Sequence, residues 1–333
     1  MNVSDIGEFG LIERLAKAVG ASKPEGLIVG IGDDAAAWRA NSAVMLATTD
    51  TLVEGVHFLP GLTPWADLGW KALAVNVSDI AAMGGRPQYA LVTLALPPET
   101  PVQAVDELYE GLGECGREYG VAVAGGDVVR APRVAITVAL LGRAEVDGAG
   151  SPRLMRRDAA RAGYAVAVTG TLGGSAAGLR RLNEGAPADD PLARAHLRPR
   201  PPLAAARRAA ELGVPCAIDI SDGLLQDLGH VCGMSGLGAV LRAAALPVRL
   251  ELRDAYPDDA LALACTGGED YEMLFVAPRE TLEALGPEIT VIGEMVEDAE
   301  RRARLVDGSG EEIRLPAAGW DHLRPEGRSS GRK

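Results

Sequence analysis

Cysteine is scarce in this sequence, and the cysteines present are poorly placed for metal or disulfide chemistry. Cys115, Cys216, Cys232 and Cys265 lie far apart and form no CxxC pair. That spacing disfavours a zinc site and gives little support to a disulfide framework. We therefore expect all four to be small buried apolar side chains.

Long apolar runs and an excess of positive charge are also missing. No stretch of the sequence reaches the roughly 18 unbroken apolar residues that a membrane span requires. The opening MNVSDIGEFGLIERL lacks the basic and then apolar order of a secretory signal, so we expect a cytoplasmic protein. The net charge is −13. Because an acidic surface repels phosphate backbones and anionic lipid, we expect neither nucleic acid nor membranes as partners.

The common phosphate-binding motifs are absent as well. No GxxxxGK[ST] occurs, and only four lysines are present, none of them directly after a glycine. Ser221-Asp222-Gly223 lacks the Phe and the catalytic-loop partner of the protein-kinase motifs. These absences exclude the P-loop NTPases and the protein kinases.

What is present fits two domains of α+β or α/β class. A chain of 333 residues exceeds the roughly 250–300 at which single cores stop growing. The Gly-rich segment Glu145–Ser151 is the best linker candidate. We expect an N-terminal domain over 1–148, a C-terminal domain over 149–326 and a disordered tail over 327–333.

Hydrophobic periodicity and turn residues place the expected elements along the chain. Helices are expected at Phe9–Val19, Thr63–Met83 with Thr63 as N-cap, Pro101–Tyr119, Gly174–Leu182, Leu203–Leu212 and from Gly223 onward. A long loop is expected at Glu184–Pro202. Strands are expected at Leu27–Ile31, Ala43–Thr48, Gln88–Leu96, Val121–Ala124, Val134–Leu141, Tyr164–Thr169, Cys216–Ile220, Glu272–Val276 and Thr290–Ile292.

Acidic residues recur beside glycine or hydroxyl residues at the ends of these elements. They are Asp33-Asp34, Asp50, Asp79, Asp127, Asp219 with Asp222, and Glu269-Asp270. Taken singly, each is explained as an N-cap or turn residue. Taken together, so many carboxylates in one place would repel one another unless a cation neutralised them. Oxygen-only ligands of this kind suit Mg²⁺, whose shell substrate phosphates can complete.

One motif suggests a different class of protein. Gly30-Ile31-Gly32-Asp33-Asp34-Ala35 fits the GxGxxA dinucleotide fingerprint, and Asp50 lies roughly 20 residues further on. Two features oppose an NAD(P)-binding oxidoreductase. Asp33 and Asp34 would face the pyrophosphate, and Ala35–Arg39 is too short for a parallel crossover, which needs about a dozen residues.

The ordered set of motifs resembles the thiamine-monophosphate kinase family across nearly the whole chain. The matching segments are GEFGLI (7–12), GIGDDAA (30–36), TTDTLVEGVHF (48–58), KALAVNVSDIAAMG (71–84), GGD (125–127), AIDISDGLLQDLGH (217–230), SGLGA (235–239), GGEDYEMLF (267–275) and GWDHL (319–323). The resemblance implies the two-domain α+β fold of aminoimidazole-ribonucleotide synthetase, with a homodimer formed through the N-terminal sheets. It implies Mg²⁺-assisted, direct in-line transfer of a phosphoryl group from ATP to thiamine monophosphate, the last step of thiamine diphosphate biosynthesis.

The resemblance also assigns residues. It implies a metal-binding set of Asp34, Thr48, Thr49, Asp50, Asp79, Asp127, Asp219 and Asp222, of which Asp50, Asp79, Asp127 and Asp219 are the catalytic candidates. It implies nucleotide contacts from Tyr109, Gly126, Asp127, Arg157 and Ser221, with Arg156 as the alternative to Arg157. It implies thiamine contacts from His57, Glu269 and Trp320.

The sequence has Thr48 where the family often has Ser, and it departs more seriously after GGD, where Val128-Val129 replaces hydroxyl residues. Other ATP-using enzymes of the same fold remain alternatives. Selenophosphate synthetase would require an N-terminal Cys and Lys, and a hydrogenase-maturation dehydratase would require a C-terminal Cys, so both are disfavoured. A non-catalytic scaffold is disfavoured because every charged motif position is retained.

Overall fold

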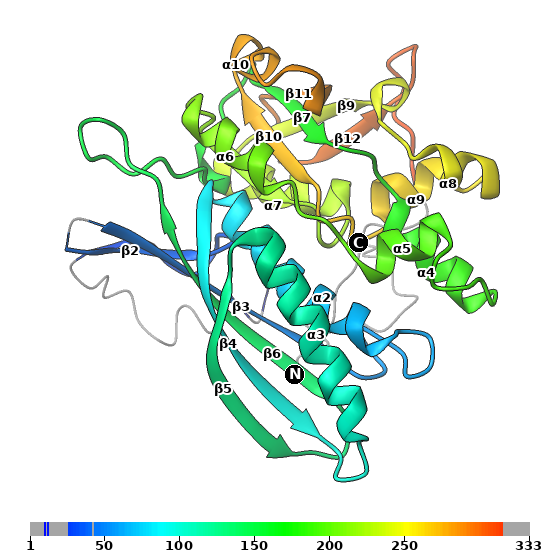
Figure 1. The fold of residues 1–333 in the computed structure, drawn as a ribbon. Coiled ribbons are helices and arrows are strands. Elements are labelled where there is room, and N and C mark those ends of the chain that lie inside the picture. The colour runs from blue at the N-terminus through cyan, green and yellow to red at the C-terminus, as the bar shows by residue number, and fades with distance from the viewer. Residues whose placement is uncertain (1–9, 11, 13–25, 42, 316–333) are drawn as a thin grey trace.

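The computed structural model describes residues 10, 12, 26–41 and 43–315. Two six-stranded sheets with their helices form two adjoining units (Figure 1). All strands of the first sheet end by Ala144, and those of the second begin at Ala165. The expected α+β class is confirmed, whereas the domain boundary at 148 stays a prediction.

The first sheet has the order β1-β2-β3-β6-β4-β5. Only β4 and β5 run parallel, and α3 makes the crossover between them, while the other neighbours are antiparallel. The strands are β1 (Leu27–Val29), β2 (Ala36–Ala40), β3 (Ala43–Val53), β4 (Gly85–Leu96), β5 (Ala122–Arg130) and β6 (Ala135–Ala144).

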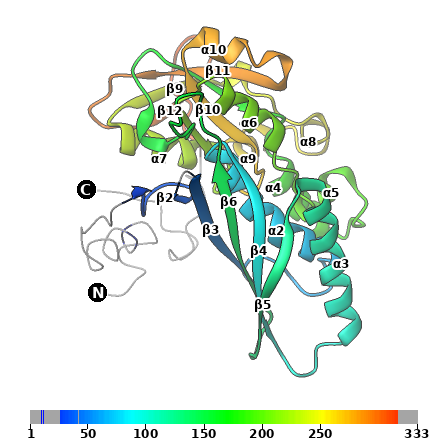
Figure 2. The same ribbon diagram turned by 60° about the vertical axis from the view of Figure 1, so that its left-hand side comes forward.

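Helices α2 (Trp65–Ala82) and α3 (Val102–Tyr119) cover one face of this sheet, as Figures 1 and 2 both show. Nearly all of α2 is buried, because it packs against the sheet, α3 and parts of the second unit. That environment explains why its sequence is apolar nearly all round. The two helices approach closely at Gly111, where a Cβ would lie 1.8 Å from the Ala66 carbonyl oxygen.

The second sheet has the order β12-β9-β11-β7-β10-β8 and is packed on both faces. Its central strands are buried at every position, as their uninterrupted apolar sequences require. The strands are β7 (Ala165–Thr169), β8 (Cys216–Asp219), β9 (Gly238–Arg242), β10 (Met273–Ala277), β11 (Ile289–Val296) and β12 (Ala303–Val306). The helices are α4 (Gly174–Asn183), α5 (Pro191–Leu197), α6 (Leu203–Glu211), α7 (Leu224–Ser235), α8 (Leu250–Ala255), α9 (Ala260–Thr266) and α10 (Arg279–Glu283), with 3₁₀ turns at Arg157–Ala159, Ala243–Ala245 and Gly286–Glu288.

The dinucleotide-binding interpretation is wrong, because β1 and β2 form an antiparallel pair in which Leu27 lies opposite Trp38. A Rossmann unit needs parallel strands joined through a helix. Two acids also lie elsewhere than expected. Asp50 sits inside the long strand β3 and Asp127 inside β5, so neither follows a strand end.

Several elements differ from the sequence expectations. The expected loop at 184–202 contains α5, with Pro191 in its first turn and Asp190 accepting hydrogen bonds from the Leu192 and Ala193 amides at 2.9 and 3.2 Å. Helix α2 begins at Trp65 with Pro64 as N-cap, so Thr63 is not the cap. Strands β2, β9 and β12 and helices α8–α10 were not expected, and the helix predicted at 9–19 lies almost wholly outside the described residues.

The four cysteines are buried and free, which confirms their expected packing role. In the part of the chain that the structure describes, no helix has both the length and the apolarity to cross a membrane.

Candidate active site

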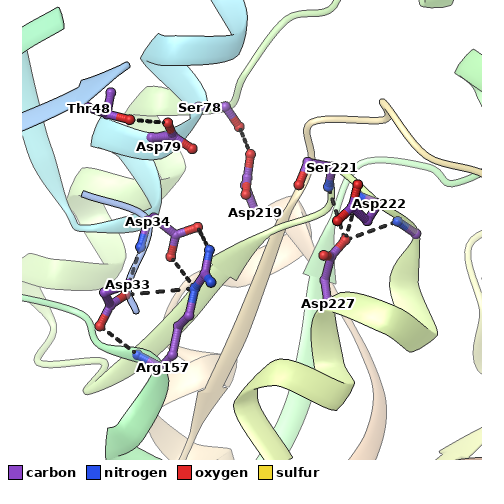
Figure 3. Close-up of polar contacts among 11 residues, drawn as sticks. Asp33, Asp34, Thr48, Ser78, Asp79, Arg157, Asp219, Ser221, Asp222 and Asp227 are labelled. Carbon is purple, nitrogen blue, oxygen red and sulfur yellow. Dashed lines mark hydrogen bonds and ion pairs between the residues drawn. The ribbon is translucent and has the colours of Figure 1, made fainter. Parts of the chain in front are cut away.

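Three of the predicted metal ligands come together from distant parts of the sequence. Asp34 follows β1, Asp79 lies near the end of α2, and Asp219 ends β8 (Figure 3). One carboxylate oxygen of each lies within 4.8 Å of those of the other two. Asp34 and Asp219 are buried and Asp79 is half-buried. We call Asp34, Asp79 and Asp219 the acid cluster.

Hydroxyl groups hold two of these carboxylates in place. Thr48 donates a hydrogen bond to Asp79 at 2.5 Å, and Ser78 donates one to Asp219 at 2.7 Å. Burial, together with the nearby carboxylates, raises the pKa values of Asp79 and Asp219 well above the usual range. The cluster is therefore short of positive charge.

Arg157 supplies part of that charge. Its guanidinium donates two hydrogen bonds to Asp34, at 2.7 and 3.0 Å, in the forked geometry that arginine adopts with carboxylates (Figure 3). Burial and the neighbouring Asp34 carboxylate raise the pKa of Asp33 to about 7. Arg156 instead pairs with the surface residue Asp158 at 2.5 Å. Of the two arginines, only Arg157 faces the acid cluster.

A tight loop between β8 and α7 carries Ser221 and Asp222. The Asp227 carboxylate accepts the backbone N–H groups of Ser221, Asp222 and Gly223, each at 3.0 Å (Figure 3). Asp227 was not among the predicted site residues, although an acid in the first turn of a helix is a recognisable capping signal. It shapes the loop that presents Ser221 and Asp222.

A cavity of about 730 Å³ opens between the two units. Two predicted metal ligands from the acid cluster, Asp79 and Asp219, line it, and so do the predicted thiamine contacts His57 and Glu269. His57 Nδ1 accepts the Val53 N–H at 3.0 Å, so the neutral ring carries its proton on Nε2. Asp50, Ser221 and Asp222 complete the predicted residues on the cavity wall.

Glu269 has two partners that the sequence did not reveal. Lys71 Nζ lies 3.0 Å, and His196 Nδ1 3.3 Å, from Glu269 Oε2. Lys71 comes from α2 and His196 from α5, so only the packing of the two units brings them together. No spacing motif links these positions.

The remaining predicted residues lie apart from the cavity or cannot be placed. Gly126 and Asp127 are on the exposed edge strand β5, and the Asp127 carboxylate accepts the amide N–H of Val128, the next residue. Tyr109 is 40% exposed on α3 and does not line the cavity. Thr49 points to the open face of the first sheet, opposite Asp50. Trp320 lies outside the described residues.

The acid cluster has the chemistry of a hard-cation site. Its donors are carboxylate oxygens supported by hydroxyl groups, which suits Mg²⁺ and not zinc or copper. The raised pKa values of Asp79 and Asp219 indicate negative charge that the protein alone leaves uncompensated. The residues present therefore fit a divalent cation.

Comparison with known proteins identifies the family of the chain. Residues 32–144 match the family described as AIR synthase related protein, N-terminal domain, and residues 161–306 match its C-terminal domain. The thiamine-monophosphate kinase of Aquifex aeolicus is 36% identical over 97% of this chain and 100% of its own length. That of Escherichia coli K12 is 39% identical over 95% of this chain and 98% of its own.

Solved structures give the same relationship. AaThiL complexed with AMPPCP and TMP matches with a TM-score of 0.85 at 34% identity, covering 97% of this chain and 99% of that chain. The two domain matches and the near full-length relatives together show the family of this chain. The chain belongs to the thiamine-monophosphate kinase family.

Proposed function

We propose that this protein transfers the γ-phosphoryl group of ATP to the phosphate of thiamine monophosphate, yielding ADP and thiamine diphosphate. The observation that carries the proposal is the shared cavity. Its wall joins Asp79 and Asp219 of the acid cluster to His57 and Glu269, the predicted thiamine contacts. The likeness to a relative complexed with AMPPCP and TMP supports both substrates.

We infer that Mg²⁺ binds at the acid cluster, held by Asp34, Asp79 and Asp219. Asp50 and Asp222 line the same cavity and Thr48 donates a hydrogen bond to Asp79, so we propose that these three extend the site. Bound there, Mg²⁺ would neutralise the phosphate charge and align the triphosphate. The oxygen-only donor set and its shortage of positive charge support this assignment.

The side chains of the chain itself position the reactants. Arg157, beside Asp34, is suited to pair with a γ-phosphate oxygen through its fork of donors. Asp227 accepts the backbone amides of the Ser221 loop and so holds it rigid, leaving the Ser221 hydroxyl and the Asp222 carboxylate to face the nucleotide and the metal. The acceptor phosphate is already ionised near neutral pH, so no strong general base is needed. Catalysis then rests on direct in-line positioning and on charge neutralisation.

The place of Asp127 leads us to propose a homodimer. Asp50 in β3 pairs with Val138 in β6, which pairs with Val92 in β4, which in turn pairs with Gly126 in β5. Three strand spacings of about 4.8 Å therefore separate Asp50 from β5. Because neighbouring residues alternate between faces, Asp127 points to the face opposite Asp50. One chain therefore cannot bring both carboxylates to one ion.

A second chain could supply the missing carboxylate. The edge strand β5 is exposed along its whole length, and Tyr89 and Leu91 of β4 are 53% and 47% exposed on the open face. Such a face is suited to pack against its copy. We propose that Asp127, with Gly126, completes the nucleotide site of the partner subunit.

Mixed dimers test this arrangement. Co-expressed Asp50→Asn and Asp127→Asn chains should regain about a quarter of wild-type activity, since half the dimers are mixed and each carries one intact site. Asp50→Asn with Asp79→Asn is the matched control and should stay inactive, because both changes fall within one chain's site. Recovery no greater than in that control would rule out a contribution from the partner.

The reaction itself is tested with purified protein, ATP, Mg²⁺ and thiamine monophosphate, following both products by chromatography. Free thiamine serves as the parallel acceptor. We expect thiamine diphosphate and ADP in equal amounts, only with Mg²⁺ and only from the monophosphate. ADP formation without thiamine diphosphate would overturn the acceptor. This reaction would be the last step of thiamine diphosphate biosynthesis, which we place in the cytoplasm.

A further inference from the structure

Glu269 is held in an uncommon backbone conformation at the cavity wall. Its φ is +66°, in the left-handed region that residues other than glycine seldom adopt. Its N–H donates to the Ser221 carbonyl at 2.7 Å, and Tyr271, with φ of +51°, donates to the Ile220 carbonyl at 2.9 Å. The surrounding structure imposes this conformation, as is common at binding sites. The backbone around Glu269 therefore fixes the position from which its carboxylate extends.

Lys71 is the first partner that fixes the Glu269 side chain. It is 1% exposed, and its Nζ lies 3.0 Å from Glu269 Oε2. A buried ammonium group without a counter-ion is costly, so the charges of Lys71 and Glu269 depend on each other. Lys71 belongs to α2 of the first unit, whereas Glu269 follows α9 of the second.

His196 is the second partner. Its side chain is 6% exposed, with Nδ1 3.3 Å from Glu269 Oε2 and 3.0 Å from Ser175 Oγ. Burial, and then the charge of Lys71, lowers the pKa of His196 to about 4, so the ring is neutral at pH 7. The hydrogen bond at Nδ1 is the one to Ser175 Oγ, in which either atom can be the donor. Ser175 thus fixes the orientation of the neutral ring, which packs against Glu269 Oε2.

Both contacts fall on the same carboxylate oxygen. In the described part of the chain, Oε2 takes Lys71 and His196, and neither contact involves Oε1. Burial alone would raise the pKa of Glu269, but Lys71, then His196, and more weakly His57, together lower it. Burial, and then the charge of Glu269, raises the pKa of the neighbouring Tyr271, which is therefore neutral beside it. Glu269 is thereby ionised and oriented, while lining the cavity.

We propose that Lys71 and His196 are positioning residues that hold Glu269 as an ionised acceptor for the N–H donors of an amino-bearing heteroaromatic ring. This inference rests on the proposed function, since the ring would be the aminopyrimidine of thiamine monophosphate. A protonated Glu269 would present a hydroxyl donor where the ring needs an acceptor. Recognition of the ring therefore depends on two residues that need not touch it.

The test compares Lys71→Met, Glu269→Gln and wild type between pH 5.5 and 9. We expect Lys71→Met to raise the KM for thiamine monophosphate about tenfold near pH 6.5, because Glu269 becomes protonated without its counter-ion. The KM for ATP should stay within twofold. The defect should disappear as the pH rises and Glu269 ionises. Glu269→Gln should raise the same KM at every pH, without recovery.

A His196 pair provides a second test that does not depend on the folding of Lys71→Met. His196→Asn keeps a polar group that can pair with Ser175 and lie beside Glu269 Oε2, and it should stay close to wild type, whereas His196→Leu should raise the KM for thiamine monophosphate several-fold. A Lys71→Met defect that is independent of pH, or equal effects on both substrates, would overturn the inference. So would equal KM values for His196→Asn and His196→Leu.

Calorimetric affinity for thiamine monophosphate separates this inference from the proposed reaction. Wild type that binds the compound without converting it would overturn the reaction. A pH-dependent loss of affinity in Lys71→Met would still support the role of Lys71. Wild type that neither binds nor converts thiamine monophosphate would overturn both.

Discussion

The carboxylates at and beside the cavity wall fall into two groups, here called its two ends, with opposite electrostatic settings. At one end, Asp34, Asp79 and Asp219 share a single arginine, Arg157. At the other end, Glu269 alone has both Lys71 and His196 beside it. Burial acts in the same direction at both ends, but the pKa values of Asp79 and Asp219 are raised and that of Glu269 is lowered.

The difference lies in how much positive charge the fold provides. Glu269 has a built-in counter-charge in Lys71, so it is ionised and can accept a hydrogen bond from a neutral donor. Acids that outnumber their counter-charges suit a cation from solution, which we propose arrives with a phosphate substrate. In the proposed function, the acid cluster would hold the cation and Glu269 would accept the thiamine ring, as transfer between ATP and an organic phosphate requires.

The largest expected effect is at the acid cluster. Asp219→Asn should lower kcat by at least about a thousandfold, since it removes a charge from the predicted metal site at nearly constant shape. Without Mg²⁺ the same change should raise the free energy of unfolding by about 1 kcal/mol, because it relieves repulsion among carboxylates. Steady-state kinetics and denaturant unfolding measure both.

The exposed Asp258 supplies the control for that change. Asp258→Asn should alter neither quantity appreciably. If Asp219→Asn kept wild-type kcat, or destabilised the metal-free protein, Asp219 would be a structural acid and not a metal ligand.

The adjacent arginines give a matched pair. Arg157→Gln should reduce kcat/KM for ATP about a hundredfold, because it removes a forked charge near the predicted γ-phosphate position. Arg156→Gln, at the surface pair with Asp158, should stay within twofold of wild type. Equal effects of the two changes would remove Arg157 from the nucleotide site.

A smaller effect is expected at His57. His57→Ala should raise the KM for thiamine monophosphate about tenfold and that for ATP much less, because the ring lines the cavity on the Glu269 side. Initial-rate kinetics with each substrate varied in turn will measure the ratio. The reverse ratio would move His57 to the nucleotide side.

The smallest effect concerns stability and pH. Folding lowers the pKa of His196 to about 4, so the unfolded chain binds the proton more readily between pH 4 and 6.5. Lowering the pH from 7 to 5 should therefore cost about 1–2 kcal/mol through this residue. Chemical denaturation at both pH values should show a smaller loss for His196→Asn than for wild type. Identical losses would contradict a neutral buried His196.

Much of the fold could be predicted from local signals. The runs that form α2, α3, β4, β7 and β10 carry clear periodicity or unbroken apolarity, and their positions are confirmed within a few residues. Short elements such as β2, β12 and α10 have too few residues to establish a period, and only tertiary pairing stabilises them. At α5, Asp190-Pro191 was a readable helix start inside a segment dominated by loop-like composition.

The candidate site likewise contains residues that the sequence predicts and residues that it does not. Asp34, Asp79 and Asp219 could be grouped beforehand because acids at the ends of several elements imply one shared cation. Lys71 and His196 could not be assigned to the site from the sequence. They belong to separate helices, α2 and α5, and nothing in the sequence indicates that both contact Glu269 in the folded protein. Asp127 could not be placed relative to Asp50 from the sequence either, because the distance between them depends on the order of the strands in the sheet.

The division of the cavity is tested most directly by calorimetric titration of Mg²⁺ into wild type, Asp219→Asn and Glu269→Gln, without nucleotide. We predict that wild type and Glu269→Gln bind Mg²⁺ with equal affinity, while Asp219→Asn loses binding by at least tenfold. Undiminished binding by Asp219→Asn, or an equal loss in Glu269→Gln, would contradict the assignment of the cation to the acid cluster.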